Sequence, residues 1–476
     1  MALVIGVDSS TQSTKLEARD AATGRLVAAS RAPHPPVSPP RSEQDPEAWW
    51  HALGRAGADL GAGPADALAV AGQQHGMVVL DAAGAVVRPA KLWNDTESAP
   101  DAAALVERLG APAWSEATGL VPVASYTVTK LAWLRRCEPG AWARLARVLL
   151  PHDWLNLRAA GVAATDRGDA SGTGYWSPAT GRWRPDLLDL VDEERDWAAA
   201  LPELRGPAEP VGALRGEARD LFGPALVGPG TGDNMAAALG LGLAPGDVAV
   251  SVGTSGTVYT VSDAPVADPD GIVAGFADAT GRYLPLVCTL NAARVLDTVA
   301  GLLGTDHGGL DALALAAPAG ARGLTLLPYL DGERTPNRPG ASGTLAGLRT
   351  LHGRGDLARA AVEGVVHGLL DGLDALVAQG LAAAGRLVLT GGGARSGAVR
   401  QVLADLSGRP VEAHAGAETV ARGAAVQAAA TLAGADPAEV AAAWRPPPDV
   451  VVEPGPGVDR AALREAYHRL RDGGEP

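Results

Sequence analysis

A short apolar run at the start of the chain stops abruptly in polar residues. The mostly β-branched residues of 4–7 predict a buried strand, which ends at Asp8 and a run of hydroxyl side chains closed by Lys15. Residues 16–18 and 26–28, joined by a turn at 22–25, predict two further strands. The turn after the first strand offers backbone N–H groups, hydroxyls, a cation and a carboxylate, which suit a nucleotide phosphate and its metal ion. An ordinary hairpin with a polar tip fits this stretch equally well.

The same pattern returns in the second half of the chain. Residues 248–252 predict a strand, residues 253–256 a turn of glycine and hydroxyl residues, and residues 257–261 the returning strand. This weak internal repeat predicts two related domains. We place the boundary at a Pro-Gly stretch before the second repeat, which gives domains of 1–243 and 244–476.

Polar residues follow other predicted strands, at the ends where α/β folds place ligands. Gln74 and His75 follow the apolar run 67–72, and Asn94 follows a shorter run. In the alternative interpretation they are loop residues that bond only to the backbone. The charged, Pro-interrupted stretch 186–217 predicts a surface insertion. Helical spacing and an N-cap signal predict helices that begin at Pro46 and that cover 126–134, 356–379, 397–406 and 460–471.

Two glycine-rich turns add candidate ligand contacts. Residues 227–233 deliver Asp233 to the start of an Ala-rich helix, and glycines let a backbone approach a ligand closely. A simple helix N-cap is the alternative interpretation of Asp233. The strand 386–390 enters Gly391–Gly393, just before the helix that begins at Gly397. Such a turn is common at nucleotide sites. In the alternative interpretation it is only a tight turn of the chain with no ligand.

Composition narrows the class of protein. The 476 residues are 47% hydrophobic and 20% charged, which is typical of a folded protein of two large domains. No apolar run approaches the length that spans a bilayer, and the chain leads from Met1 into a strand, so we expect no membrane partner and no signal peptide. Cys137 and Cys288 form no disulfide framework, which favours a reducing cytoplasm. The net charge of −14 argues against nucleic acid as a partner.

The order of these motifs carries a family resemblance. Two hydroxyl-rich hairpins, a Gly-Asp-Asn turn and a Gly-Gly-Gly turn resemble the FGGY carbohydrate kinases, whose nucleotide-binding core is shared with actin, hexokinase and chaperone ATPases. Segments 126–133 and 343–363 are similar to the two signatures of that family, and the resemblance spans essentially the whole chain. It implies an α/β fold of two actin-like ATPase (ribonuclease H-like) domains with a cleft between them. The first domain would bind sugar and carry the first phosphate loop, the second would bind nucleotide, and the final helix 460–471 would pack back on the first domain.

Within the family, five segments are similar to members that phosphorylate D-xylulose to D-xylulose 5-phosphate, in the catabolism of xylose. They are 42–46, 72–76, 92–95, 171–173 and 327–336. Gln12 stands where many relatives have Thr, and Gln74 where some have Met. Three alternatives stay open: a kinase for ribulose, glycerol, another polyol or a deoxysugar; a non-catalytic sensor of sugar and nucleotide; and a chaperone- or actin-like ATPase.

The resemblance also assigns roles to individual residues, and it implies ATP and Mg²⁺ as cofactors and a homodimer. Asp233 would be the general base that takes the proton from O5 of the ketose, and Asp8 would hold Mg²⁺. The sugar hydroxyls would be bound by Gln74, His75, Asn94 and Asp233. The phosphates would be bound by Thr11, Gln12, Ser13 and Lys15 and by Gly253, Thr254 and Ser255. The adenosine would be bound by Gly392, Gly393 and Gly397.

Overall fold

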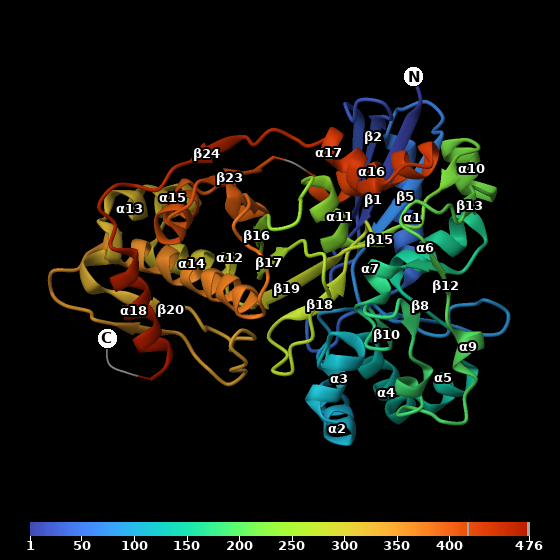
Figure 1. Cartoon of the computed structure of the whole chain (residues 1–476), viewed down its shortest axis with the longest axis horizontal. Helices are drawn as coiled ribbons and strands as arrows, with labels where there is room; N and C mark the ends of the chain where they lie inside the picture. Colours follow the sequence, from blue (N-terminus) through green and yellow to red (C-terminus); the bar gives the residue numbers. More distant parts are fainter. Residues whose placement is uncertain (417, 474–476) are drawn as a thin grey trace. The chain divides into compact units, whose positions relative to one another are not determined.

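The computed structural model describes residues 1–416 and 418–473, and their backbone contacts divide the chain into two compact units (Figure 1). The first unit consists of residues 1–243, 263–284 and 418–446. The second consists of the described parts of 244–262, 285–417 and 447–476. The cut after residue 243 therefore agrees with one boundary, but two later segments return to the first unit, so the units differ from the two consecutive domains predicted from the sequence.

The main sheet of the first unit has the strand order β13-β14-β5-β1-β2-β3, with β15 also pairing with β5. Antiparallel pairing joins β1 to β2 and β2 to β3, whereas β5 runs parallel to β1 and β14 parallel to β5. These strands are β1 (Leu3–Ser9), β2 (Ser13–Asp20), β3 (Leu26–Pro33), β5 (Ala67–Gly72), β13 (Gly212–Ala213), β14 (Leu226–Val227) and β15 (Thr231–Gly232). The predicted strands at the start of the chain are thereby confirmed.

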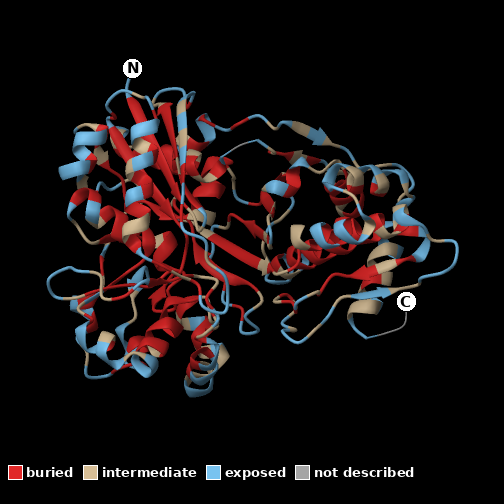
Figure 2. Ribbon diagram, turned by 180° about the vertical axis from the view of Figure 1, so that it is seen from behind, coloured by how far each residue is buried: buried red, intermediate tan, exposed pale blue. Residues whose placement is uncertain are grey.

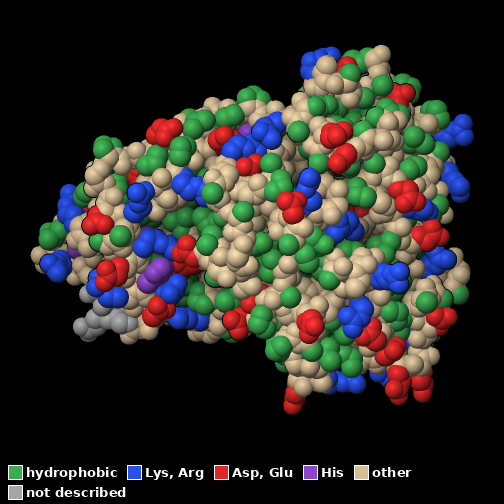
Figure 3. All heavy atoms as spheres, viewed as in Figure 1, with side chains coloured by type: hydrophobic (Ala, Val, Ile, Leu, Met, Phe, Trp, Pro, Cys, Tyr) green, Lys and Arg blue, Asp and Glu red, His purple; other side chains and the backbone are tan. Residues whose placement is uncertain are grey.

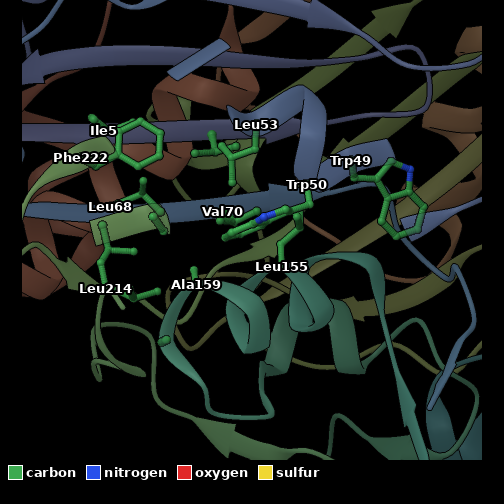
Figure 4. Close-up of a cluster of buried hydrophobic side chains, with 14 of the residues drawn as sticks. Ile5, Trp49, Trp50, Leu53, Leu68, Val70, Leu155, Ala159, Leu214 and Phe222 are labelled. Atoms are coloured by element: carbon green, nitrogen blue, oxygen red, sulfur yellow. The ribbon is translucent and has the colours of Figure 1, made fainter. Parts of the chain in front are cut away.

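Helices cover both faces of this sheet. Side chains of a strand alternate between the two faces, and the residues of β1 are buried on both. Ile5 of β1 points to a core that includes Trp49 and Leu53 of α1 (Pro46–Asp59) and Leu155 of α6 (Pro151–Ala160), as Figure 4 shows. Gly6, the next residue along, faces α16 (Thr419–Ala433). The Asp45 side chain accepts a hydrogen bond from the Glu47 amide, which confirms the predicted start of α1.

A second hydrophobic cluster of the first unit corrects one prediction. Residues 186–217 were expected to form a surface insertion, but Leu188, Val191 and Trp197 are buried in a cluster with Trp142. The Trp197 indole donates a hydrogen bond to the Asp192 backbone carbonyl at 2.9 Å. The charged stretch is therefore held against the rest of the first unit by its buried apolar residues. The other elements of this unit are β4 (Glu43–Gln44), β6 (Val78–Leu80), β7 (Ala90–Lys91), β8 (Arg147–Leu149), β9 (Ala164–Asp166), β10 (Trp176–Ser177), β11 (Arg182–Trp183), β12 (Glu203–Arg205), β18 (Ala274–Ala277), α2 (Ala99–Leu109), α3 (Ala111–Thr118), α4 (Thr127–Cys137), α5 (Pro139–Arg144), α7 (Arg167–Ala170), α8 (Pro185–Leu188), α9 (Trp197–Ala200), α10 (Gly216–Phe222), α11 (Asp233–Gly240) and α17 (Pro437–Ala443).

The close packing of α11 on α16 gives the first testable prediction. A Cβ added to Gly423 of α16 would lie 1.8 Å from the Ala236 carbonyl oxygen of α11. Gly423→Ala should therefore destabilise the protein by about 1–3 kcal/mol, the usual cost of overpacking, and lower the thermal unfolding midpoint measured by calorimetry. Gly54→Ala is the matched control, because a Cβ there meets nothing within 4 Å, so alanine should stabilise helix α1 by about 0.5–1 kcal/mol. Equal midpoints for the two variants would contradict the prediction.

The second unit repeats the strand plan of the first, which confirms the predicted internal repeat. Its strands follow the order β19-β17-β16-β22-β23-β24, and the directions from β19 to β23 match those from β3 to β14. The strands and turns of this unit are β16 (Val248–Val252), β17 (Gly256–Thr260), β19 (Tyr283–Thr289), β20 (Thr325–Leu327), β21 (Thr344–Ala346), β22 (Leu387–Thr390), β23 (Val411–Ala413), β24 (Val450–Val452), η1 (Ala319–Gly323) and η2 (Gly392–Arg395).

The helices of the second unit are α12 (Ala293–Leu303), α13 (His307–Ala316), α14 (Arg354–Ala378), α15 (Gly397–Ser407) and α18 (Arg460–Arg471). Helix α14 is buried along most of its length, and buried residues are drawn in red in Figure 2. The final helix α18 packs on α14, α15 and β20, whereas the sequence predicted it on the first domain. Tyr467 stacks on His367 of α14, and Arg464 and Arg471 both bond to Asp371, which explains this placement.

Candidate active site

The carboxyl ends of strands β1, β5 and β15 bring predicted site residues to one edge of the first sheet. In the register of the sheet, Asp8 lies opposite Ala71, and Ala71 lies opposite Thr231. Gln74 follows β5 by two residues, and Asp233 directly follows β15. The parallel pairing of β5 with both neighbours thus gathers the candidate base, the candidate metal ligand and a candidate sugar contact from positions up to 225 residues apart.

A hydrogen-bonded bridge holds the Asp233 carboxylate. Its Oδ1 accepts from the backbone N–H of Asn234 at 2.9 Å and from the Asn234 Nδ2 at 3.1 Å. The same Asn234 Nδ2 donates to Gln74 Oε1 at 2.8 Å. A Cβ at Gly232 would lie 2.6 Å from Gln74 Cγ, so glycine is required where the two segments meet. Gly232, not Asp233, is the N-cap of α11, and the simple N-cap interpretation of Asp233 is wrong.

The surroundings of Asp233 make its carboxylate a stronger base than usual. Burial raises the pKa of Asp233 to about 7, and the negative charges of Asp8 and Asp169 act in the same direction. The hydrogen bond from the Asn234 amide opposes the shift of the pKa and is outweighed. A carboxylate with a pKa near neutrality is suited to accept a proton from a hydroxyl group.

Asp8 is a buried carboxylate that pairs with a cation through one of its two oxygens. Its Oδ2 is 3.3 Å from Lys15 Nζ, which also donates to Glu418 Oε2 at 2.7 Å. Asp8 is 2% exposed, and burial raises its pKa to about 6 against the opposing charge of Lys15. Its other oxygen, Oδ1, has no hydrogen-bond partner among the described residues. Asp8 therefore has one oxygen free for a further ligand.

This arrangement fits a magnesium ion that is held partly by other groups. Mg²⁺ favours one or two carboxylates together with phosphate oxygens and water, and Asp8 Oδ1 offers one such oxygen. In the described part of the chain, the groups of three acidic or histidine side chains close enough to share an ion do not include Asp8. One is Glu43, Asp95 and Glu97, where Lys91 Nζ already lies 2.8 Å from Asp95 and 2.6 Å from Glu97.

The hydroxyl turn after β1 presents its residues in different ways. Thr11 Oγ1 donates to Gln73 Oε1 at 3.1 Å and accepts from the Trp93 indole at 3.0 Å. The Gln12 side chain is exposed, whereas Ser13 is buried and its carbonyl accepts from the Ser10 amide at 3.1 Å. Thr11 thus links the turn to the loops that follow β5 and β7, which the sequence did not predict.

The remaining predicted sugar contacts also belong to the first unit. His75 has the left-handed φ of 66°, and its ring packs edge-on against Tyr126 at 5.1 Å and beside Phe276 at 5.5 Å. Strain of this kind is concentrated at functional sites. Gln74 Nε2 and Asn94 Oδ1 are buried and have no hydrogen-bond partner in the described residues, so a donor and an acceptor are free for a polar ligand.

In the second unit, two predicted nucleotide turns lie beside each other. Strands β16 and β22 are parallel neighbours, with Ser251 opposite Thr390, so the turns after them leave the same edge of the sheet. Gly253 N–H donates to the Ser255 carbonyl at 3.0 Å, and Thr254 is exposed at the tip. A Cβ at Gly393 would lie 2.4 Å from Val252 Cγ1, so the two turns need glycine to pack.

Gly397, a predicted adenosine contact, has a protein partner for its backbone N–H. Its N–H, at the start of α15, donates to Asp311 Oδ2 at 2.7 Å, and the Ser396 hydroxyl donates to Asp311 Oδ1 at 2.5 Å. The Gly397 N–H and the Ser396 hydroxyl are therefore both bonded to a carboxylate of α13. Gly392 is exposed, and the main chain of η2 carries it past the end of β22.

Sequence reasoning missed two residues of the site. Asn234, which bridges Asp233 and Gln74, was visible only as the residue after the candidate base. Glu418 pairs with Lys15 across 403 positions of the sequence, and no local pattern predicts such a contact. Both contacts depend on how the chain returns to the first sheet.

Surface and helix properties complete the description. On the face drawn in Figure 3, acidic and basic side chains are interspersed and form no extended basic area. Within residues 1–416 and 418–473, no helix combines the length and apolar character needed to cross a membrane.

Comparisons of the sequence with known proteins identify the family of this chain. The N-terminal domain model of the FGGY family of carbohydrate kinases matches residues 3–240, and the C-terminal domain model matches residues 248–432. The chain is 50% identical over 446 residues to the xylulose kinase of Streptomyces coelicolor, covering 93% of this chain and 90% of that protein. It is 38% identical to the xylulose kinase of Escherichia coli, with 87% of each covered.

A solved structure gives the same result. The crystal structure of xylulose kinase from Bifidobacterium adolescentis has a TM-score of 0.87 and 42% identity, with 99% of both chains covered. The predicted fold class, two α/β domains of the actin-like ATPase type, is confirmed. The chain belongs to the FGGY family of carbohydrate kinases.

Proposed function

We propose that this protein transfers the γ-phosphoryl group of ATP to O5 of D-xylulose, giving D-xylulose 5-phosphate in the catabolism of xylose. The observation that carries the proposal is the Gln74–Asn234–Asp233 bridge at the edge of the first sheet, where a basic carboxylate lies beside free polar groups. The identity of 50% to a xylulose kinase supports this sugar over others.

In this proposal Asp233 is the general base. With a pKa of about 7 it is largely ionised just above neutral pH, and it takes the proton of the attacking O5 hydroxyl. Gln74, His75 and Asn94 bind the other hydroxyls of the sugar and orient O5 toward the carboxylate. Orientation matters because phosphoryl transfer depends mainly on positioning and on neutralising charge.

The nucleotide contacts in this proposal are the residues that the family resemblance assigns. Thr11, Gln12, Ser13 and Lys15, with Gly253, Thr254 and Ser255, would bind phosphates, and Gly392, Gly393 and Gly397 would bind adenosine. Asp8 would hold Mg²⁺ through its free Oδ1, directly or through water. When bound there, Mg²⁺ would supply positive charge that offsets the negative charge of the phosphates. The charge of Lys15 opposes the rise that burial causes in the pKa of Asp8 and so favours the ionised carboxylate.

The division of roles follows the sequence halves, with sugar binding and the first phosphate turn in 1–243 and nucleotide binding in 244–476. A cytoplasmic location is favoured by the two cysteines, Cys137 and Cys288, which are both free. We include a homodimer in the proposal, and light scattering of the purified protein tests it.

The second candidate is a kinase of the same mechanism for D-ribulose, glycerol or another polyol. Turnover of D-xylulose, D-ribulose, glycerol and xylitol, measured by ADP release in a coupled assay, separates these. We expect kcat/KM for D-xylulose to exceed each of the others by about tenfold or more, because an unpaired buried polar group in the site penalises the wrong sugar. A higher value for another sugar would replace D-xylulose. If no sugar tested causes ADP release, the result would favour a non-catalytic sensor, whereas ADP release in the absence of sugar would favour an ATPase.

A further inference from the structure

Behind the candidate base lies a buried cluster of one histidine and three carboxylates, which we call the His152 cluster. His152 Nδ1 lies 2.7 Å from Asp169 Oδ2, and His152 Nε2 lies 3.2 Å from Asp153 Oδ1 and 3.9 Å from Asp166 Oδ1. All four side chains are at most 2% exposed. The reaction proposed above does not use these four residues.

The cluster holds charge in the interior. Burial opposes the charged form of His152, but Asp153, Asp169 and Asp166 outweigh it and raise the pKa of His152 to about 9. Burial raises the pKa of Asp153 to about 7 and that of Asp166 to about 6. A buried ion cluster is rarely the most stable filling of a core, since apolar residues of similar volume often serve better. Its presence calls for a role beyond stability.

Hydrogen bonds and close packing connect the cluster to the segment that carries Asp233. Asp166 Oδ2 accepts from the Thr231 hydroxyl at 2.7 Å, and Thr231 and Gly232 form β15, directly before Asp233. Gly168, in the helix α7 that carries Asp169, packs so tightly that a Cβ there would lie 2.7 Å from Thr231 Oγ1.

The turn before β15 also rests on His152 itself. A Cβ at Gly230, whose φ is 77°, would lie 2.7 Å from the His152 ring. Asn156, one turn after His152 in α6, donates to the Pro229 carbonyl at 2.8 Å. The residues from Pro229 to Gly232 are thus bound from one side by α6 and the His152 cluster.

We propose that His152, Asp166 and Asp169 are positioning residues for Asp233: Asp166 fixes β15 through Thr231, His152 supports the turn at Gly230 and holds the Asp169 carboxylate, and the negative charge of Asp169 acts on the Asp233 carboxylate. This inference rests on the proposed function, in which Asp233 is the base. A cluster with a purely structural role would lower stability when altered but would leave the turnover of the folded enzyme unchanged.

The positional part is tested with Thr231, which touches neither the proposed substrate nor the nucleotide. Thr231→Val removes the hydroxyl that bonds to Asp166 and keeps the shape of the side chain. We expect kcat to fall about tenfold with KM for D-xylulose within about twofold, because a displaced base slows the chemical step. Thr231→Ser keeps the hydroxyl and should retain most of kcat. Equal kcat for the Val and Ser variants would overturn the positional part.

The electrostatic part is tested with Asp169→Asn. Two charged groups act on Asp233, namely Asp8 and Asp169, and both raise its pKa. The hydrogen bond from the backbone N–H of Asn234 lowers the pKa of Asp233. Removing the charge of Asp169 lowers the pKa of Asp233, so the acidic limb of the kcat/KM profile, which lies near pH 7 in the wild type, should move down by about half a pH unit or more. His152 keeps Asp153 and Asp166 as partners, which favours its charged form.

The control for the electrostatic part is Asp220→Asn, which makes the same change of net charge at an exposed position of α10 and should leave the limb in place. An unmoved limb in Asp169→Asn would overturn this part, and if that variant does not fold, the Thr231 pair still decides. Wild-type enzyme without D-xylulose-dependent ADP release would refute the proposed function and with it this inference. Active wild type with unchanged variants would refute the inference alone.

Discussion

Replacing Asp233 by alanine is expected to lower kcat with D-xylulose by about 10²–10⁴-fold, the usual contribution of a general base. The physical reason is the environment of this carboxylate, whose pKa of about 7 lets it accept a proton near neutral pH. No other carboxylate of the described residues is bonded to the Asn234 and Gln74 bridge, so none replaces it directly. Initial rates from ADP release at saturating sugar and ATP give the measurement.

The isosteric variant Asp233→Asn separates the loss of the base from the loss of shape. It can still accept from the Asn234 amide through its carbonyl oxygen, yet it cannot take a proton, so its kcat should be as low as that of the alanine variant. ADP affinity, measured by calorimetry, should stay within about twofold in both variants because Asp233 is not a proposed nucleotide contact. Near-normal turnover in either variant would show that Asp233 is not the base.

The strands and helices that carry the site were largely predictable, because each has a strong local signal. The run from Leu3 to Ser9 is a strand with every residue buried, and β-branched residues ended by polar ones predict that. The internal repeat predicted the matching strand plans of the two units, and Asp45 with Pro46 predicted the start of α1. Each of these features depends on residues that are close together in the sequence, so a local pattern is enough to predict it.

The features that were missed depend on distant contacts. The segments 263–284 and 418–446 return to the first unit, and the second of them supplies Glu418 to Lys15 and helix α16 to the sheet. The charged stretch 186–217 looked solvated, yet its tryptophan and leucines are buried because a few apolar residues suffice to anchor it. The His152 cluster was invisible because burial of charge cannot be seen in a sequence.

The same limit applies to the roles of single site residues. Thr11 was predicted to bind phosphate, and the structure adds hydrogen bonds to Gln73 and Trp93 that occupy its hydroxyl. Gly397 was predicted to be an adenosine contact, and the structure adds a hydrogen bond from its amide to Asp311. In both cases the residue type correctly predicted a polar turn. The hydrogen-bond partner of the residue depends on the tertiary structure and could not be predicted.

Asp8→Ala is the second change with a large expected effect, and it should reduce kcat by about 10³-fold at saturating Mg²⁺. Asp8 Oδ1 is the buried oxygen without a partner in the described residues, and its loss removes the proposed protein ligand of the ion. The charge of Asp8 also pairs with Lys15 at 3.3 Å, so the variant leaves Lys15 with Glu418 alone. Affinity for Mg²⁺-free ADP should be unchanged, while the Mg²⁺ concentration needed for half-maximal activity should rise at least tenfold.

Glu418→Gln is the matched control for Asp8→Ala, because it removes the other carboxylate that pairs with Lys15. Glu418 is half-exposed, and exposed ion pairs contribute little, so kcat and the Mg²⁺ requirement should change less than about threefold. If both variants lost activity equally, the role of Asp8 would lie in holding Lys15 rather than the ion. Unchanged turnover in Asp8→Ala would exclude Asp8 from the reaction, and a lower affinity for Mg²⁺-free ADP would place it at the nucleotide itself.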